Sequence, residues 1–305
     1  MNKPILITGA TSGIGKAAAR ALSSRGHDVF AGYRDPRDRT VHAQVPGVHP
    51  VQLDVGDPTQ IRSAVSEVED AVGAEGLFAV INNAGITYMA PFEYAQLDQV
   101  RQIIDVNLVA PYLVAQACIP MLRRYNEADA VKSRVVNIAS WAGMMAAPFV
   151  GFYNATKFGL TGLTESMYYD LGLLGIHVVL ANPGVTKTPL LARTTDGAVA
   201  GADLMPAEAR AFYLPYLKHV ASMGEGSANS RMLLTPEQVA CKIAKIVDSS
   251  KPRFEYNLAM DAKVVDGIMT RIVPFRVRAA LNRRMYRLGQ LEPQFETRSE
   301  VPAVA

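Results

Sequence analysis

Apolar and polar positions along this chain follow two different spacings. Short, almost continuous apolar runs occupy residues 4–8, 29–33, 48–53, 78–81, 134–139 and 177–181. Between them, apolar residues recur every three or four positions over 59–72, 97–121 and 152–173, which is the spacing of helices that bury one face. Buried strands that alternate with such helices indicate a parallel sheet covered on both sides. The pattern therefore predicts an α/β fold.

A glycine-rich turn follows the first apolar run. Gly9, Gly13 and Gly15 stand between that run and a helical pattern. Glycines allow a tight turn and bring the backbone close to a pyrophosphate, which the free N–H groups of a helix N-terminus attract. A plain strand-to-helix turn explains the same glycines if they are considered alone. The loop of phosphate-binding NTPases does not fit, because it needs Gly and Ser or Thr where Ala10 and Ala17 stand.

A tyrosine and a lysine stand four residues apart in the helical pattern of 152–173. This spacing places Tyr153 and Lys157 on one helix face. A phenol has an ordinary pKa of about 10, and a nearby ammonium favours its ionised form. The pair therefore predicts a proton-transfer device. On ordinary helices the same spacing occurs with a packed tyrosine and a solvated lysine, so the rest of the chain must decide.

Four further motifs supply that context. They are Asn82-Asn83-Ala84-Gly85 after an apolar run, Asp105-Val106-Asn107, the run 135–140 that ends at Ser140, and 182–188 with its Pro183-Gly184 pair. Together with Thr8-Gly9-x-x-x-Gly13-x-Gly15 and the Tyr-x-x-x-Lys pair, they make the chain resemble the compact, single-domain branch of the short-chain dehydrogenases/reductases over about residues 3–258. The resemblance implies a doubly wound, Rossmann-type parallel sheet of seven strands, with helices on both faces.

The resemblance also implies an activity, the transfer of a hydride between a nicotinamide and a carbonyl or secondary-alcohol carbon. Tyr153 would be the general acid/base, and Lys157 would lower its pKa and bind the nicotinamide ribose. Ser140 would hold the substrate oxygen, and Asn107 would place a water on the proton path. Individually, Ser140 ends a strand and Asn107 satisfies backbone groups in a helix. The four together favour the catalytic interpretation.

The end of the second apolar run bears on the choice of cofactor. An acidic residue there would bind the 2′-hydroxyl of NAD, but the chain has Arg34. A guanidinium suits the 2′-phosphate of NADP, so NADP(H) is the predicted cofactor and NAD(H) the alternative. Ser12 stands where relatives often have a second basic residue. Asp54 resembles the aspartate that meets the adenine, although it also suits a helix cap before Pro58.

The implied cofactor-binding residues lie in five segments and in the catalytic helix. They are Gly9, Thr11, Ser12, Gly13, Ile14, Gly15, Arg34, Asp54, Val55, Asn83, Ala84, Gly85, Tyr153, Lys157, Pro183, Gly184, Val185 and Thr188. No metal site is expected, because the chain shows no cluster of His and Cys at ligand spacing.

Residues 189–234 are predicted to form a lid over the substrate, with 224–226 as a flexible hinge. The segment is rich in Leu, Phe and Tyr, and Trp141, Met144, Met145 and Phe149 lie where the substrate wall of the family would be. An apolar wall with several methionines suits a bulky lipophilic ketone or alcohol. Alternatively, several of these residues belong to the core or to a subunit interface.

The chain has 305 residues, 49% of them hydrophobic, and a formal net charge of +3. This length and composition suffice for one large domain with a full core. No membrane-spanning segment or secretory signal is predicted, and Cys118 and Cys241 are expected to be buried free thiols. A cytoplasmic enzyme is the natural interpretation. The chain lacks the broad basic surface expected of a nucleic-acid-binding protein.

Positive charge is concentrated near the C-terminus. Residues 251–288 contain nine Lys and Arg against three acidic residues. We expect a catalytic domain over 1–258, two basic amphipathic helices over 259–288, and a disordered tail over 289–305. The two helices are suited to packing on the domain or on a neighbouring subunit, to covering the substrate mouth, or to lying on an anionic membrane.

Two other functions fit parts of the pattern. A sensor that binds NADP without turnover needs the glycine turn but not the four catalytic residues. A sugar-nucleotide epimerase shares Tyr-x-x-x-Lys, but its glycine turn is usually G-x-x-G-x-x-G, which does not fit here. The resemblance further implies a homodimer or homotetramer that packs through the helices of 97–121 and 152–173.

Overall fold

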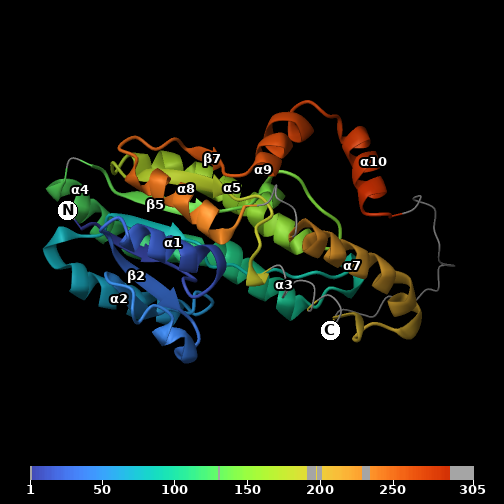
Figure 1. Cartoon of the computed structure of the whole chain (residues 1–305), viewed down its shortest axis with the longest axis horizontal. Helices are drawn as coiled ribbons and strands as arrows, with labels where there is room; N and C mark the ends of the chain where they lie inside the picture. The colour runs from blue at the N-terminus through green and yellow to red at the C-terminus, as the bar shows by residue number, and fades with distance from the viewer. Residues whose placement is uncertain (1, 130, 191–196, 198–200, 229–233, 289–305) are drawn as a thin grey trace.

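The structure, a computed structural model, describes residues 2–129, 131–190, 197, 201–228 and 234–288. Its centre is a sheet of seven parallel strands in the order β3-β2-β1-β4-β5-β6-β7 (Figure 1). The strands are β1 (Pro4–Ile7), β2 (Asp28–Tyr33), β3 (Val48–Gln52), β4 (Ala79–Asn82), β5 (Arg134–Ile138), β6 (His177–Asn182) and β7 (Glu255–Asn257). The strand order reverses between β1 and β4, which confirms the doubly wound, Rossmann-type α/β fold.

Helices cover both faces of the sheet. On one face α1 (Gly13–Ser23) and α8 (Pro236–Asp248) lie side by side (Figure 1) and share a core with β1 and β4. On the other face, α2 (Pro58–Val72), α4 (Ala110–Ala128) and α5 (Gly151–Gly172) bury a second set of aliphatic side chains against the same strands. The central strands are therefore apolar on both sides, as their continuous apolar sequence predicts.

The helix predicted over 97–121 is longer and is not regular throughout. It begins as α3 (Leu97–Ile104), passes through a π-helical turn (Asp105–Val109) and continues as α4 to Ala128. This stretch is long and apolar enough to cross a membrane by length and composition. Its inner face is buried against the sheet and α2, which identifies it as a core helix. Asn107 lies in this π-helical turn, and its side chain contacts the loop after β4. Such turns are frequent at functional sites.

Short elements complete the body. They are the single-turn helices η1 (Pro36–Thr40), η2 (Gly73–Glu75), η3 (Phe92–Tyr94) and η5 (Trp141–Gly143). Helix α8 begins with a capping box between Thr235 and Gln238, whereas α2 is capped by Asp57 and not by Asp54. Cys118 is buried, but the prediction of a buried thiol is wrong for Cys241, which lies on the exposed face of α8.

A buried arginine ties the sheet to the end of α8. Arg134 is fully buried at the start of β5, and its guanidinium donates to the carbonyl oxygens of Val247 at 2.7 Å and Ser249 at 2.6 Å. It also lies over the ring of Phe78, 4.5 Å from the ring centroid. The last carbonyl groups of a helix have no partner within the helix, so this cation satisfies them and holds α8 against β5.

The predicted lid and the C-terminal segment are mainly helical where the structure describes them. Helix α7 (Ala207–Ala228) runs without interruption through 224–226, so the predicted hinge is wrong at that point. Beyond β7 come α9 (Met260–Val264), a second π-helical turn (Val265–Thr270) and α10 (Phe275–Met285). In Figure 1, α9 and α10 project from the layered body. The predicted tail, 289–305, and parts of the predicted lid, 191–196, 198–200 and 229–233, lie outside the described residues.

Candidate active site

The glycine turn after β1 has the geometry of an anion cradle. Gly9 and Gly13 have φ of +62° and +51°, a left-handed conformation that favours glycine. A Cβ on Gly15 would overlap the carbonyl oxygen of Gly9 and the side chain of Asn83. Helix α1 starts directly after Ser12, whose side chain makes no cap hydrogen bond, and its first turn has no acidic residue. Its N-terminal N–H groups therefore suit a phosphate group.

Residues after β4 lock this turn in place. The Asn83 side chain donates to the carbonyl oxygens of Thr8 and Gly9, both at 3.0 Å. The Thr8 hydroxyl accepts in return from the backbone N–H groups of Asn83 and Ala84, also at 3.0 Å. A Cβ on Gly9 would lie 2.9 Å from the Cα of Ala84. Two motifs that are 75 residues apart in sequence thus form one interlocked unit.

The residues predicted to meet the adenosine lie after β2 and β3. Arg34 is exposed and has no hydrogen-bond or ion-pair partner within the described part of the chain. The adjacent carboxylate is already engaged, because Arg37 pairs with Asp35 at 2.5 Å and holds the pKa of that carboxyl at about 2. The Asp54 side chain accepts from the backbone N–H of Gly56 at 2.9 Å. The guanidinium of Arg34 is therefore free to meet an anion.

The predicted catalytic side chains gather at the end of β5. Ser140 follows the strand and accepts from the backbone N–H of Ala142 at 3.1 Å. Tyr153 and Lys157 lie one turn apart on α5, with the Lys157 Nζ atom 5.8 Å from the centroid of the tyrosine ring. The Lys157 ammonium is buried and donates to the carbonyl oxygen of Ile138 at 3.0 Å. Ser140 also lies close enough to Tyr153 to act on its hydroxyl in the direction that lowers the tyrosine pKa.

Burial shifts the pKa values of both members of the pair. Burial lowers the pKa of Lys157 to about 8, because the charged form is poorly solvated inside the protein. Burial also raises the pKa of Tyr153 above its ordinary value, and the hydrogen bond to Ser140 opposes this only in part. Burial is the larger of these two causes, so the net shift of the tyrosine pKa is upward. The lowering of that pKa by Lys157 stays a prediction.

Asn107 links the π-helical turn to the loop after β4. Its side-chain oxygen accepts from the backbone N–H of Ile86 and its amide donates to the carbonyl oxygen of Ile86, both at 2.8 Å. The amide also lies 3.2 Å from the Thr156 hydroxyl on α5. Asn107 does satisfy backbone groups, but those of a neighbouring loop and not of its own helix. A Cβ on Gly85 would lie 3.4 Å from Asn107 Oδ1 and 3.9 Å from Lys157 Nζ, which places Gly85 beside both side chains.

The segment after β6 packs close to the glycine turn. A Cβ on Gly13 would lie 3.2 Å from the Thr188 side chain. The carbonyl oxygen of Pro183 accepts from the backbone N–H of Trp141 at 3.3 Å, which places this segment beside Ser140. The backbone N–H of Val185 donates to the Asp261 carboxylate at 2.8 Å. In the sequence, Asp261 is only one of the three acidic residues of 251–288, and a contact between positions 76 residues apart leaves no local signal.

Apolar residues form a wall next to the catalytic group. Phe149, with φ of +62°, packs edge to face against Tyr213 of α7 at 6.3 Å, and its carbonyl oxygen accepts from Ala90. Leu217 is fully buried and Met205 nearly so, which makes these two predicted lid residues core, whereas Leu204 is 72% exposed. Part of the predicted lid is thus a packed layer over the segment that follows Ser140.

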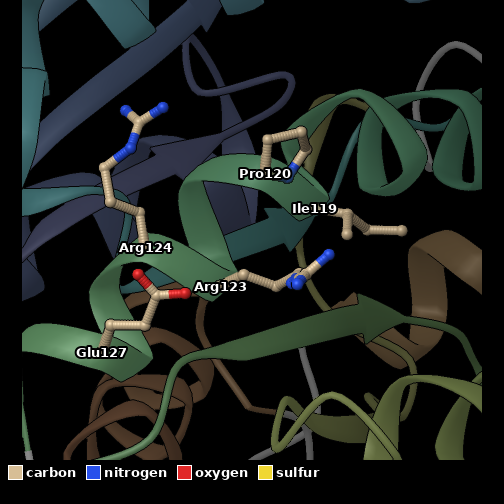
Figure 2. A pocket seen from close by; sticks show the side chains of 5 residues that line it. All are labelled: Ile119, Pro120, Arg123, Arg124 and Glu127. Atoms are coloured by element: carbon tan, nitrogen blue, oxygen red, sulfur yellow. The ribbon is translucent and has the colours of Figure 1, made fainter.

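A separate hollow lies on the outer side of α4 and is distinct from this site. Figure 2 shows its lining, which consists of Ile119, Pro120, Arg123, Arg124 and Glu127. All five residues come from one helix, and none belongs to the predicted catalytic or cofactor-binding set. Arg124 is already paired with Glu69 of α2 at 2.9 Å. No group of three potential metal ligands among His, Cys, Asp and Glu occurs in the described part of the chain.

The predicted residues are therefore brought together at one edge of the sheet. The residues after β1, β4, β5 and β6 lie within contact distance of one another, and those after β2 and β3 follow at the same edge. The glycine cradle, the uncapped helix N-terminus and the space beside Gly85 fit a dinucleotide. A hydroxyl pair backed by a buried ammonium suits proton transfer to or from an oxygen.

The chain is similar in sequence to known dehydrogenases and reductases. A family model described as short chain dehydrogenase matches residues 3–198. The chain is 30% identical over 194 residues to the NADPH-dependent 3-dehydrocapnine reductase of Ornithobacterium rhinotracheale, covering 63% of this chain and 68% of that protein. It is 29% identical over 290 residues to retinol dehydrogenase 5 of Mus musculus, covering 88% of each.

Solved structures agree on the fold. A crystal structure of a short-chain dehydrogenase from Streptomyces avermitilis matches with a TM-score of 0.71 and 24% identity, over 92% of this chain and 94% of that one. The family match spans more than half of the chain and includes both the glycine turn and the Tyr-x-x-x-Lys pair. The chain therefore belongs to the short chain dehydrogenase family.

Proposed function

We propose that this protein is an NADP(H)-dependent oxidoreductase that interconverts a carbonyl group and a secondary alcohol on a bulky lipophilic substrate. The observation that carries the proposal is the grouping of Ser140 and Tyr153 with the buried ammonium of Lys157, beside a glycine turn shaped for a dinucleotide. The family to which the chain belongs consists of dehydrogenases and reductases, which supports this class of reaction.

The chain's own residues divide the work of the reaction. When bound, the nicotinamide supplies or accepts the hydride. In the direction of reduction, the Tyr153 hydroxyl donates its proton to the substrate oxygen, and the Ser140 hydroxyl holds that oxygen and stabilises the charge that develops on it. Lys157 stabilises the tyrosinate that remains. Asn107 holds the loop after β4 in place through its hydrogen bonds to Ile86. Its amide also contacts Thr156 on α5, the residue before Lys157, so Asn107 lies beside the lysine on the proposed proton path.

Arg34 supports NADP(H) as the preferred cofactor. Its guanidinium stands at the end of β2 and remains unpaired in the described part of the chain, while Arg37 neutralises the nearby Asp35. A free planar cation at this place suits a 2′-phosphate, whereas a 2′-hydroxyl would call for a carboxylate. The NADPH-dependent reductase similar to this chain supports the same assignment. NAD(H) is the alternative.

The wall beside Ser140 supports a lipophilic substrate. Met89, Met205, Phe149 and Tyr213 form one apolar cluster next to the catalytic residues. Methionine and aromatic side chains adapt to large apolar molecules better than to small polar ones. Retinol dehydrogenase 5, to which most of this chain is similar, bears the name of such a substrate.

Two rival functions are less well supported. A sensor that binds NADP without turnover requires no hydroxyl pair and no buried ammonium, yet both are assembled here. A sugar-nucleotide epimerase would need a polar substrate site, whereas the described wall is apolar.

The protein is also proposed to form a homodimer or homotetramer in the cytoplasm. Tyr112 of α4 and Phe158 and Tyr168 of α5 are each more than 40% exposed on helices that otherwise pack in the core. Apolar residues of this size on adjacent helices are typical of subunit interfaces.

The C-terminal segment is proposed to contact an anionic membrane surface. Ile272 and Phe275 are each 72% exposed, so they do not pack on their own domain. Arg276, Arg283 and Arg284 lie on the same segment and have no acidic partner within the described residues. The Asn282 side chain of α10 approaches the carbonyl oxygen of Ala146 in the substrate wall at 3.5 Å. A membrane here would lie close to the entrance for a lipophilic substrate.

Replacing the catalytic hydroxyl tests the proton-transfer role. The Tyr153→Phe variant should reduce kcat by about a hundredfold or more, because proton transfer by a positioned group contributes that much, while NADPH still binds. Steady-state assays at 340 nm with a panel of lipophilic ketones measure the first effect, and fluorescence titration measures the second. Tyr169→Phe, an exposed position on the same helix, should leave kcat unchanged. A Tyr153→Phe enzyme as fast as the wild type would disprove the assignment.

Replacing Arg34 tests the cofactor assignment. A charge-assisted hydrogen bond is worth about 1.5–3 kcal/mol, so Arg34→Ala should weaken NADPH binding about ten- to a hundredfold. NADH binding should change little, since NADH has no 2′-phosphate. Calorimetric titration of both cofactors gives the two dissociation constants, with Arg123→Ala as an exposed control on α4. The assignment fails if Arg34→Ala weakens both cofactors equally.

Vesicle flotation tests the membrane contact. The protein should float with vesicles that contain phosphatidylserine but not with vesicles of phosphatidylcholine alone. Each Arg near the surface contributes about 1 kcal/mol, so a variant with Arg276, Arg283 and Arg284 changed to Glu should stay unbound, and added salt should have the same effect. Arg123→Glu is the matched control. If that triple variant floats like the wild type, or instead loses its oligomeric state, the segment serves another purpose.

A further inference from the structure

The segment after β6, which would bind the nicotinamide in the proposed site, is held by the carboxylate of Asp261 from the C-terminal part of the chain. Asp261, in the first turn of α9, accepts a hydrogen bond from the backbone N–H of Val185 at 2.8 Å through one oxygen. Its other oxygen accepts from the backbone N–H of Ala262, also at 2.8 Å. Both oxygens are thus engaged with backbone donors, which fixes the plane of the carboxylate against the segment after β6.

Gly184 shows how closely the two segments approach. A Cβ added there would overlap the Asp261 carboxyl group, and the three atoms nearest to that Cβ all belong to it. Gly184 does not have a positive φ, so its backbone conformation would accept other residues. The group that a side chain at this position would have to displace is therefore the carboxylate of Asp261. The glycine and the aspartate are complementary in shape across 77 residues of sequence.

The carboxylate is placed by the backbone that leads to it. The backbone N–H of Leu258 donates to the carbonyl oxygen of Asn182 at 2.9 Å, and the Lys242 ammonium of α8 donates to the carbonyl oxygen of Leu258 at 2.6 Å. Both contacts fix the chain three residues before Asp261. The backbone that leads to Asp261 is therefore held by the sheet and by α8, and the half-buried carboxylate itself is held by the N–H groups of Val185 and Ala262.

We propose that Asp261 is a positioning residue of the cofactor site, which shapes the Gly184–Val185 turn so that the backbone there is ready for the nicotinamide end of the cofactor. Because Asp261 belongs to α9, this contact also couples the C-terminal segment to the cofactor site. The cofactor part of the proposal rests on the proposed function. The structural part, the complementarity of Gly184 and Asp261, stands by itself.

Binding measurements with a whole cofactor and with a fragment separate positioning from general stability. Asp261→Ala should raise the Kd of NADPH about tenfold, the loss expected for one charge-assisted hydrogen bond. The Kd of adenosine 2′,5′-bisphosphate, which lacks the nicotinamide, should stay the same. Asp261→Asn should have the smaller effect, because its carbonyl oxygen still accepts from Val185. Asp266→Ala is the matched control, since Asp266 lies on the next turn and contacts Asn257 and Arg271 instead.

A stability cycle tests the contact without any cofactor. Gly184→Ala should lower the Tm, and Asp261→Ala in the same chain should recover a large part of the loss, because it removes the group with which the new methyl overlaps. If Gly184→Ala leaves the Tm unchanged, or if the double variant is no more stable than Gly184→Ala, the shape argument is wrong. If Asp261→Ala weakens NADPH and the fragment equally, Asp261 is only structural. A wild-type protein that binds no NADPH would reject the proposed function, and the Tm cycle would still decide on the contact.

Discussion

The buried ammonium of Lys157 is the constraint around which the site is organised. A charged group without adequate partners is costly inside a protein, so its surroundings must be fixed in advance. The carbonyl oxygen of Ile138, at the end of β5, accepts its hydrogen bond, and the space beside Gly85 leaves it open toward the cofactor side. Burial lowers the pKa of Lys157 to about 8, the direction expected for an ammonium that has lost most of its hydration.

The sheet and the helices that cover it both help to hold the residues around Lys157 in place. The parallel sheet brings the ends of β1, β4, β5 and β6 to one edge, and the interlock of Thr8 with Asn83 makes two of those ends a single rigid unit. The π-helical turn points Asn107 at the loop after β4. The Asp261 carboxylate holds the segment after β6 by accepting a hydrogen bond from the backbone N–H of Val185. Rigid strand ends that carry polar loops are the usual way in which α/β proteins position chemistry.

The sheet and the grouping of the candidate residues at the strand ends could be predicted from the sequence, because both leave local signals. Continuous apolar runs fixed six of the seven strands, and short motifs at their ends marked the glycine turn, Ser140 and Tyr153. Strand β7 was implied only by the family resemblance, because its three residues are too short to show a period. The prediction for Cys241 was wrong because the exposure of this side chain depends on which face of α8 meets the core. The prediction of a hinge was wrong because the glycines of 224–226 belong to α7 despite the low helix propensity of glycine. The contact of Asp261 and the raised pKa of Tyr153 arise from tertiary packing, which no local pattern encodes.

The central claim is that these residues serve hydride transfer to a substrate carbon. The most direct test is to follow the deuterium of NADPH labelled at C4 during the reduction of a lipophilic ketone. The account predicts that one face of the labelled cofactor delivers its deuterium to the carbon that becomes the alcohol carbon, which mass spectrometry of the product detects. Turnover in which the label returns to the cofactor, as in an epimerase, or binding of NADPH without any transfer, as in a sensor, would contradict it.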